Sequence, residues 1–208
     1  MFSPVEKEVI ALGAEAEIIK AEWWGRDTVI KRRIVKGYRH PKLDSEIRKE
    51  RLRREVRLMR DARKAGVPIP VIYDVIPEEA TLIFQFFPGE RVMDCIESGI
   101  ELDLELMGRY IGKLHGADIT HGDLTTSNIL YDPEKKSFCF IDFSLGDKTT
   151  SIEDKGVDLH LMREALIAVH ENPITLYERI LKGYREEFSD AEETISKVKD
   201  IESRGRYL

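Results

Sequence analysis

The hydrophobic pattern divides the chain into a first part rich in predicted strands and a second part rich in predicted helices. In the first part, short β-prone runs flank one stretch, about residues 43–64, whose apolar residues recur every three or four positions as in an amphipathic helix. The predicted strands are residues 18–23, 28–31, 71–76 and 81–86. Gly25-Arg26-Asp27 joins the first two as a hairpin turn, and Gly66-Val67-Pro68 ends the helix.

Pro88-Gly89 marks the change to the second part, which the pattern predicts to be helical around one further hairpin. The helices are predicted at residues 103–115, 158–170, 174–188 and 191–203, and the hairpin strands at 129–131 and 138–141. Strands with one helix followed by helices predict an α+β fold with two lobes, residues 1–87 and 88–208. Ligands usually bind in clefts between such lobes.

The composition is that of an ordinary globular protein. Of the 208 residues, 42% are hydrophobic and 35% are charged, and no apolar run reaches the roughly 20 residues that a membrane-spanning helix needs. The first residues show no signal-peptide pattern. Two cysteines, Cys95 and Cys139, allow neither a disulfide framework nor a cysteine-based metal site. We therefore expect a cytoplasmic protein with no membrane association.

The net charge of -6 hides an uneven distribution. Residues 26–64 contain 16 Lys and Arg against 6 Asp and Glu, whereas the remainder contains 17 basic and 33 acidic residues. Such a stretch could present a basic face to phosphates or to an acidic partner. The alternative is a solvated helix face with no partner.

One segment carries the pattern of phosphoryl transfer. His121-Gly122-Asp123 is followed by Asn128, by the predicted hairpin, and by Ile141-Asp142-Phe143. An Asp, a gap of four residues, an Asn, a hairpin and a second Asp after apolar residues is the spacing of the kinase fold. It predicts Asp123 as the carboxylate that accepts a hydroxyl proton. Asn128 and Asp142 are predicted to hold Mg²⁺, which needs few protein ligands.

A kinase fold also requires a phosphate-pairing Lys on the third strand and a helix Glu that orients it. Lys31 in Val29-Ile30-Lys31 matches the strand Lys. Glu55 lies beside the apolar stripe of the long helix and is the predicted partner. Glu50 lies further from that stripe and is the alternative.

Several motifs together resemble the small atypical kinase of the KEOPS complex, known as PRPK in its animal form. The most specific are Lys36-Gly37-Tyr38-Arg39-His40-Pro41 and Glu153-Asp154-Lys155-Gly156-Val157-Asp158, and the resemblance runs from Gly13 to the last residues. We therefore expect this chain to have a protein-kinase-like fold with two lobes, in a minimal form with a truncated helical C-terminal lobe. The tail at 204–208 resembles the basic tail of the family but is shorter.

The resemblance implies a function. The family binds ATP with Mg²⁺, phosphorylates itself or proteins on Ser or Thr, and acts as an ATPase. Its complex forms threonylcarbamoyl-adenosine in tRNA, where it contacts the threonylcarbamoyl transferase subunit and a small subunit on its N-terminal lobe. The residues expected to contact ATP, besides Lys31, Asn128 and Asp142, are Gly13, Ala14, Glu15 and Ala16 in the phosphate loop and Gln85 and Phe86 in the hinge.

Departures from ordinary protein kinases keep two alternatives open. Gly13-Ala14-Glu15-Ala16 replaces the glycine-rich loop, His-Gly-Asp replaces His-Arg-Asp, and Ser144 stands where the metal-binding motif usually has Gly. A small-molecule phosphotransferase of the aminoglycoside or choline kinase type also uses His-Gly-Asp, but it needs a larger helical lobe. A non-catalytic nucleotide-sensing scaffold is the second alternative, and retention of the catalytic residues argues against it.

Overall fold

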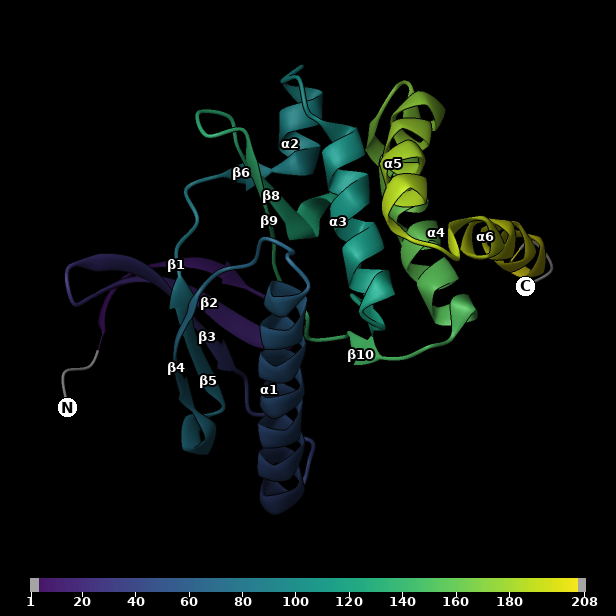
Figure 1. The fold of residues 1–208 in the computed structure, drawn as a ribbon. Helices are drawn as coiled ribbons and strands as arrows, with labels where there is room; N and C mark the ends of the chain where they lie inside the picture. Colours follow the sequence, from purple (N-terminus) through teal and green to yellow (C-terminus); the bar gives the residue numbers. More distant parts are fainter. Residues whose placement is uncertain (1–3, 206–208) are drawn as a thin grey trace. The chain divides into compact units, whose positions relative to one another are not determined.

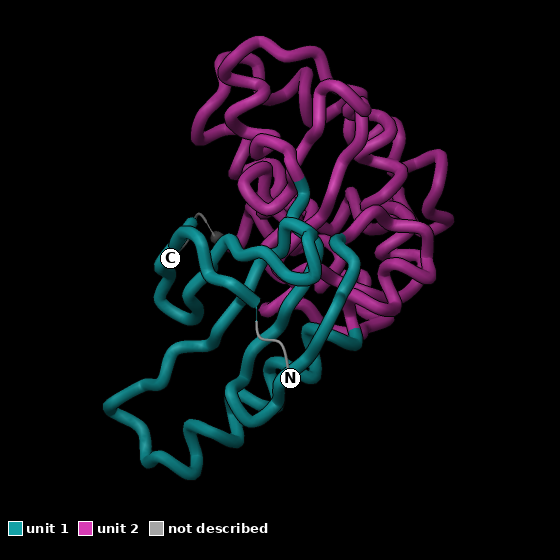
Figure 2. Tube along the Cα trace, turned by 90° about the vertical axis from the view of Figure 1, so that its left-hand side faces the viewer, with its two compact units in different colours: residues 1–57, 70–87 teal, residues 58–69, 88–208 magenta. Residues whose placement is uncertain are grey.

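The computed structural model describes residues 4–205, so residues 206–208 of the basic tail lie outside the described part. The chain divides into two compact units (Figure 2). Unit 1 comprises residues 1–57 and 70–87, and unit 2 comprises residues 58–69 and 88–208. The predicted lobes, 1–87 and 88–208, differ from these units in residues 58–69, and they stay a prediction.

Unit 1 is built on a five-stranded antiparallel sheet with the strand order β1-β2-β3-β5-β4 (Figure 1). The strands are β1 (Val5–Leu12), β2 (Ala16–Trp23), β3 (Arg26–Arg33), β4 (Ile72–Ile76) and β5 (Thr81–Gln85), with a 3-10 turn η1 (Pro77–Glu79) between the last two. Trp24 and Gly25, both with positive φ, make the tight β2–β3 turn. The four predicted strands are present, and β1 is an additional one.

The two faces of this sheet differ in chemistry. Ile30 on β3 lies between Ile19 on β2 and Ile83 on β5, and these three side chains belong to one buried apolar cluster. Side chains alternate along a strand, so Lys31 points to the opposite face. That face of the sheet contacts helix α1, because Lys31 binds Glu55 of this helix.

Helix α1 (Pro41–Lys64) is the predicted long helix. Near its start, the buried carboxylate of Asp44 accepts from Arg48 Nε at 2.7 Å and from the backbone N–H of Lys36 at 3.3 Å, and Arg39 lies 3.5 Å away. The bond from Arg48, with these two further contacts, holds the pKa of Asp44 below its ordinary value of 3.8. Asp44 therefore ties the 36–39 segment to the first turns of the helix.

Unit 2 is mostly helical. Its helices are α2 (Val92–Glu97), α3 (Leu104–Gly116), α4 (Ile152–Val169), α5 (Pro173–Glu187) and α6 (Ala191–Gly205). Its strands are β6 (Glu90–Arg91), β7 (Ile119–Thr120), β8 (Ile129–Asp132), β9 (Ser137–Phe140) and β10 (Asp147–Lys148), which form the sheets β6-β8-β9 and β7-β10. The sequence pattern missed α2 and the three short strands, and it placed the start of α4 six residues too late.

Close contact between α3 and α5 forms the centre of unit 2 and depends on glycine. A Cβ on Gly108 would lie 1.9 Å from the carbonyl oxygen of Ile180, and one on Gly183 would lie 1.8 Å from that of Glu105. No side chain fits at either position, so the backbones of the two helices touch. Buried Met107 and Ile111 of α3 complete this core.

The structure also bears on the two cysteines and on the length and apolar character of the helices. Cys95 and Cys139 are both free and buried, and burial raises the pKa of the Cys139 thiol to about 12. Such thiols are inert. Over residues 4–205, none of the helices combines the length and the apolar character that crossing a membrane requires.

Candidate active site

In unit 1, β3 and α1 bring Lys31 and Glu55 into direct contact. Lys31 Nζ donates to Glu55 Oε1 at 2.6 Å, and the two side chains are only 6% and 2% exposed. Burying an ion pair costs desolvation energy, so such a pair is a candidate for function. Glu50, the alternative partner, is exposed on the same helix. The catalytic role of both residues stays a prediction.

A second cation, Arg33, binds the same carboxylate. Its guanidinium donates to Glu55 Oε2 at 2.5 Å, and its side chain is 2% exposed. Arg33 was not among the predicted site residues, although it lies two residues after Lys31 on β3 and therefore on the same face. That spacing was the available signal.

The predicted phosphate loop, Gly13 to Ala16, is the turn between β1 and β2. The N–H of Gly13 donates to the carbonyl of Ala16 at 3.0 Å and closes the turn. Lys36 Nζ donates to the carbonyl of Ala14, and Arg51 of α1 pairs with Glu15 at 2.5 Å. The turn is thus attached at two points to the rest of unit 1.

The predicted hinge residues follow the same sheet. Gln85 bonds Val71 through its backbone N–H at 2.8 Å, and its side-chain oxygen accepts from the Val71 N–H at 3.3 Å. The N–H of Phe86 donates to the carbonyl of Asp27 at 3.2 Å, and Lys20 Nζ lies 4.3 Å from the centre of the Phe86 ring. The Phe86 amide and ring are therefore both engaged within unit 1.

In unit 2, the predicted catalytic loop runs from β7 into a 3-10 turn, η2 (Thr126–Asn128). Asn128 Nδ2 donates to Asp123 at both the carboxylate Oδ2, at 2.8 Å, and the backbone carbonyl, at 2.9 Å. The spacing of five residues thus brings these two polar side chains into contact, and the Asn128 amide oxygen lies at the opposite end of its amide group.

Asp142 directly follows the β8–β9 hairpin. The N–H of Ile141 donates to the carbonyl of Asn128 at 3.0 Å, so the hairpin brings the segment that carries Asp142 next to Asn128. Asp142 has φ of +61°, a left-handed conformation that costs energy in most residues but that Asp tolerates. Its Oδ1 accepts from the N–H of Ser144 at 3.2 Å. Strained backbone of this kind is typical of functional sites.

Asp158 on α4 holds the predicted catalytic loop in place through hydrogen bonds. Its two oxygens accept the backbone N–H groups of His121, at 2.6 Å, and Gly122, at 2.8 Å, and the side chain is 1% exposed. His115 Nε2 lies 3.3 Å from the same carboxylate. Asp158 ends the Glu153–Asp158 motif of the sequence, but the motif alone does not indicate this role.

The structure also explains why Gly122 replaces the usual Arg. Gly122 has φ of +78°, and a Cβ there would lie 2.2 Å from the carbonyl oxygen of Leu145. No side chain can be accommodated without moving that backbone. His-Gly-Asp is therefore a packing requirement of this loop.

The donor atoms fit Mg²⁺. Over residues 4–205, no three His, Cys, Asp or Glu side chains are grouped so as to hold a metal ion. Mg²⁺ prefers oxygen ligands, takes few from the protein and completes its shell with phosphates and water. The Asp142 carboxylate and the Asn128 amide oxygen are donors of that kind.

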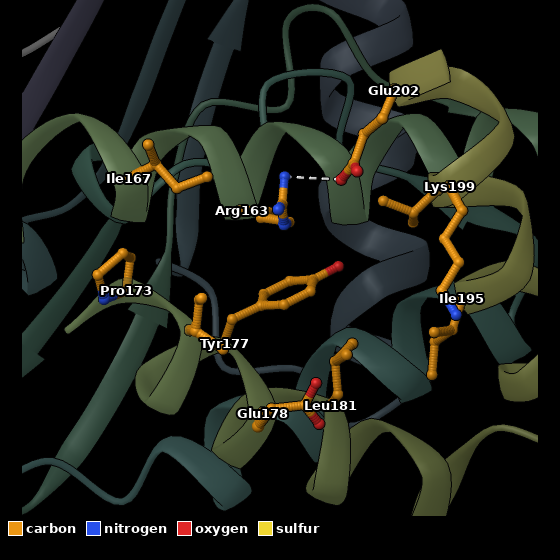
Figure 3. Close-up of a pocket in the computed structure, with 11 residues that line it drawn as sticks. Arg163, Ile167, Pro173, Tyr177, Glu178, Leu181, Ile195, Lys199 and Glu202 are labelled. Carbon is orange, nitrogen blue, oxygen red and sulfur yellow. Dashed lines mark ion pairs between the residues drawn. The ribbon is translucent and has the colours of Figure 1, made fainter.

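A cavity of about 230 Å³ lies elsewhere in unit 2, among α4, α5 and α6 (Figure 3). Tyr177, Ile195 and Val198 contribute to its wall, and Arg163 and Glu202 form an ion pair of 2.7 Å beside it. None of the predicted site residues lines this cavity.

Comparison with solved structures establishes the fold. The chain superposes on Rio2 kinase of Chaetomium thermophilum, solved as an ADP/Mg²⁺-phosphoaspartate complex, with a TM-score of 0.60 and 13% sequence identity. The match covers 98% of this chain and 73% of that one. Residues 95–184, which include Asp123, Asn128 and Asp142, match the lipopolysaccharide kinase (Kdo/WaaP) family. The fold is therefore that of an atypical protein kinase, and the α+β, kinase-like prediction is confirmed.

Sequence relatives define the family. The KEOPS complex subunit Bud32 of Pyrococcus abyssi is 38% identical over 213 residues, which cover 96% of both chains. The probable bifunctional tRNA threonylcarbamoyladenosine biosynthesis protein of Methanothermobacter thermautotrophicus is 42% identical over 204 residues. That match covers 96% of this chain and 36% of the relative, so the chain spans little more than a third of such bifunctional proteins. This chain belongs to the Bud32 family, and the predicted resemblance is confirmed.

Proposed function

We propose that this chain is an ATP-dependent phosphotransferase that serves a KEOPS-type complex in forming threonylcarbamoyl-adenosine in tRNA. Its Bud32 relative carries the name of that complex and matches along nearly the whole chain. The geometric observation that best supports the proposal is the hydrogen bonding of Asn128 to Asp123. It places the candidate metal ligand next to the candidate proton acceptor in one loop.

The proposed mechanism assigns one role to each residue. Lys31, oriented by Glu55, binds the phosphates of ATP. Asp123 accepts the proton of the attacking hydroxyl while the hydroxyl oxygen bonds to the γ-phosphorus and the bond to the ADP oxygen breaks. Asn128 and Asp142 would hold Mg²⁺, which would neutralise charge on the phosphates of ATP. The Gly13–Ala16 turn and the hinge residues Gln85 and Phe86 contact the nucleotide.

The acceptor is the hydroxyl of a Ser or Thr side chain, in the chain itself or in a protein substrate, or it is water. With water as the acceptor, the same arrangement makes the chain an ATPase. We further propose that it works as a cytoplasmic subunit that contacts the threonylcarbamoyl transferase subunit and a small subunit bound to its strand-rich part.

A reconstitution experiment tests the proposal. The formation of threonylcarbamoyl-adenosine is measured on tRNA with the other subunits present, with wild-type chain, with Asp142→Ala, and without the chain. We expect product with the wild type only. ADP and phosphoprotein measured in the same reactions separate hydrolysis from phosphorylation. Equal product without the chain would contradict the proposal.

The small-molecule phosphotransferase has less support. The lipopolysaccharide kinase match covers residues 95–184 alone, whereas the relatives that match nearly the whole chain are tRNA-modification proteins. ATP consumption stimulated by an aminoglycoside or by choline, and not by the other subunits and tRNA, would favour that alternative.

A further inference from the structure

A chain of buried hydrogen bonds in unit 2 leads from helix α5 to the predicted catalytic loop. The hydroxyl oxygen of Tyr184 on α5 lies 2.7 Å from Nδ1 of His115 on α3. His115 Nε2 lies 3.3 Å from Asp158 Oδ2, and the same oxygen accepts from the His121 N–H. The side chains of Tyr184, His115 and Asp158 are at most 1% exposed. The chain therefore connects α5, α3 and α4 in the interior of the unit.

The Asp158 carboxylate determines where the hydrogen of the His115 ring lies. A carboxylate only accepts hydrogen bonds, so His115 Nε2 carries a hydrogen. A neutral imidazole has one donor and one acceptor nitrogen, so Nδ1 is the acceptor and the Tyr184 hydroxyl is its donor. Burial raises the pKa of Tyr184 above its ordinary value of 10.0, so the hydroxyl keeps its proton. Each member of the chain therefore has one orientation.

The surroundings of the His115 ring make the Tyr184 hydroxyl important. The ring meets the rings of Tyr184 and Phe188 edge on, with centroids 5.4 and 6.1 Å away. Without the hydroxyl, Nδ1 would be a buried acceptor beside aromatic carbon, which is costly. Moving the hydrogen to Nδ1 would turn the lone pair of Nε2 toward the Asp158 carboxylate, and two acceptors repel each other. Either change disturbs the contact between His115 and Asp158.

We propose that Tyr184 is a positioning residue for phosphoryl transfer. Its hydroxyl keeps the ring hydrogen of His115 on Nε2, where it binds Asp158. Asp158 in turn accepts from the backbone N–H groups of residues 121 and 122, which directly precede Asp123. A displaced Asp158 carboxylate would displace that backbone and the Asp123 side chain with it. This inference rests on the proposed function, since it concerns the loop that carries the proposed proton acceptor.

NMR of the ring nitrogens in the full chain tests the position of the hydrogen directly. The chain has five histidines, and the signals of His115 are those that disappear in His115→Gln. We expect a neutral His115 ring with its hydrogen on Nε2 in the wild type. In Tyr184→Phe, we expect the hydrogen on Nδ1 in part of the molecules. A charged ring or a hydrogen on Nδ1 in the wild type, or an unchanged ring in the variant, would overturn the inference.

Steady-state ADP formation by the full chain, as a function of MgATP concentration, tests the effect on turnover. Tyr184→Phe removes the hydroxyl and keeps the ring. We expect kcat to fall about fivefold or more, while KM for ATP changes by less than about twofold. The KM should be retained because the chain of hydrogen bonds ends at the loop of Asp123, whereas Lys31 belongs to unit 1. A kcat within about twofold of wild type would contradict the proposal.

Tyr177→Phe is the matched control for a purely structural effect. Tyr177 is buried on the same helix, and its hydroxyl donates to the carbonyl of Leu159 on α4 at 3.2 Å. We expect this control to lose thermal stability as Tyr184→Phe does, but to keep its kcat. Thr194→Val is a second control, because Thr194 of α6 contacts the Tyr184 hydroxyl outside the chain to Asp158. An equal loss of kcat in either control would overturn the inference.

His115→Gln separates positioning from packing, because an amide nitrogen donates to Asp158 and has no second tautomer. We expect its kcat to lie within about threefold of wild type, and Tyr184→Phe to lower kcat by less than about twofold when added to it. The same loss from Tyr184→Phe in both backgrounds would refute a role through His115. If Tyr184→Phe does not fold, as circular dichroism would show, His115→Phe replaces it. This variant has no donor, and a kcat equal to that of His115→Gln would overturn the inference.

Failure of the inference is distinguishable from failure of the proposed function. A wild-type chain that turns over ATP, with a Tyr184→Phe variant that matches it, contradicts the inference alone. A wild-type chain that neither binds nor consumes MgATP, alone or with its complex, contradicts the proposed function and this inference with it.

Discussion

Asn128 donates to Asp123 through its side-chain nitrogen, at 2.8 Å to Oδ2 and at 2.9 Å to the backbone carbonyl. This double contact fixes which end of the Asn128 amide faces the carboxylate. Its oxygen lies at the other end, where it can serve as a ligand for a metal ion. One short loop thus orients both the proposed proton acceptor and the proposed metal ligand.

Removal of the carboxylate of Asp142 or of Asp123 should abolish or strongly reduce activity. Asp142→Ala should abolish MgATP turnover, because it removes the charged member of the proposed metal-ligand pair. Asp123→Asn should reduce turnover by roughly 10²-fold or more, the usual size of a general-base contribution. Phosphotransfer and phosphate release should both be measured, with Asp147→Asn on exposed β10 as control. Near-wild-type turnover of either variant would refute the assignment.

Lys31 and Glu55 should behave as one unit. Lys31→Ala and Glu55→Ala should each reduce turnover strongly, and the double variant should be little worse than either single one, because each residue works through the other. Glu50→Ala is the matched control, since Glu50 is exposed on the same helix. Additive losses, or a larger effect at Glu50, would show that the pair is misassigned.

The sequence predicted best where a pattern is local. The apolar stripe of α1 identified Glu55, and the spacing from Asp123 to Asn128 identified two residues that the structure brings into contact. Asp158 was missed because its contact with the His121 N–H joins residues 37 positions apart, which no short pattern reveals. Arg33 was missed although its spacing of two residues from Lys31 places both side chains on one face of β3.

The missed elements have specific causes. β1 is exposed along its whole length, so its residues show no alternation between buried and exposed positions. The start of α4 was misplaced because Gly156 and a buried Lys155 interrupt the helical pattern. Lys155 is buried because it pairs with Asp118 at 3.0 Å. The Ser151 side chain accepts from the Asp154 N–H, and this helix-capping pattern was the usable signal.

Gly122→Ala should destabilise the protein far more than a comparable glycine substitution. Its Cβ would lie 2.2 Å from the Leu145 carbonyl oxygen, in addition to the strain of positive φ. Gly99→Ala is the matched control, because Gly99 has φ of +71° and open space around it. We expect the control to cost about 1–2 kcal/mol and Gly122→Ala more than about 4 kcal/mol, measured by urea unfolding. Equal losses of stability in the two variants would show that the loop can move away from the added Cβ at no energetic cost.

Asp44 should contribute to stability in a pH-dependent way. The pKa of Asp44 is lowered in the folded protein, first by the hydrogen bond from Arg48. Its contribution to the free energy of unfolding is therefore fully present at pH values above the pKa of the unfolded chain. That contribution is lost as the pH falls through the folded pKa, below the ordinary value of 3.8. Asp44→Asn should therefore lower the melting temperature at pH 7, and the difference from wild type should shrink below about pH 4. A constant difference from pH 7 to pH 2 would contradict this.

The basic stretch yields the last prediction, because the structure separates the engaged arginines of α1 from the available ones. Arg48 binds Asp44 and Arg51 binds Glu15, whereas Arg53 and Arg57 are exposed. Arg60 is also exposed, with a 3.1 Å contact to neighbouring Asp61. Such exposed cations, about one helical turn apart, suit the phosphates of an RNA backbone.

We predict that changing Arg53, Arg57 and Arg60 together to Gln weakens tRNA binding by the assembled complex. Each phosphate contact contributes about 0.7 to 0.9 to the slope of log affinity against log salt, so the loss of three should reduce the magnitude of that slope by about 2 to 3. The control changes Lys135, Lys136 and Lys182 to Gln, which alters the net charge equally at exposed residues that do not belong to α1. Because the triple variant leaves Arg48 and Arg51 intact, the helix should remain attached and the complex should still assemble. An unchanged slope and affinity with normal assembly would mean that these arginines form a solvated helix face.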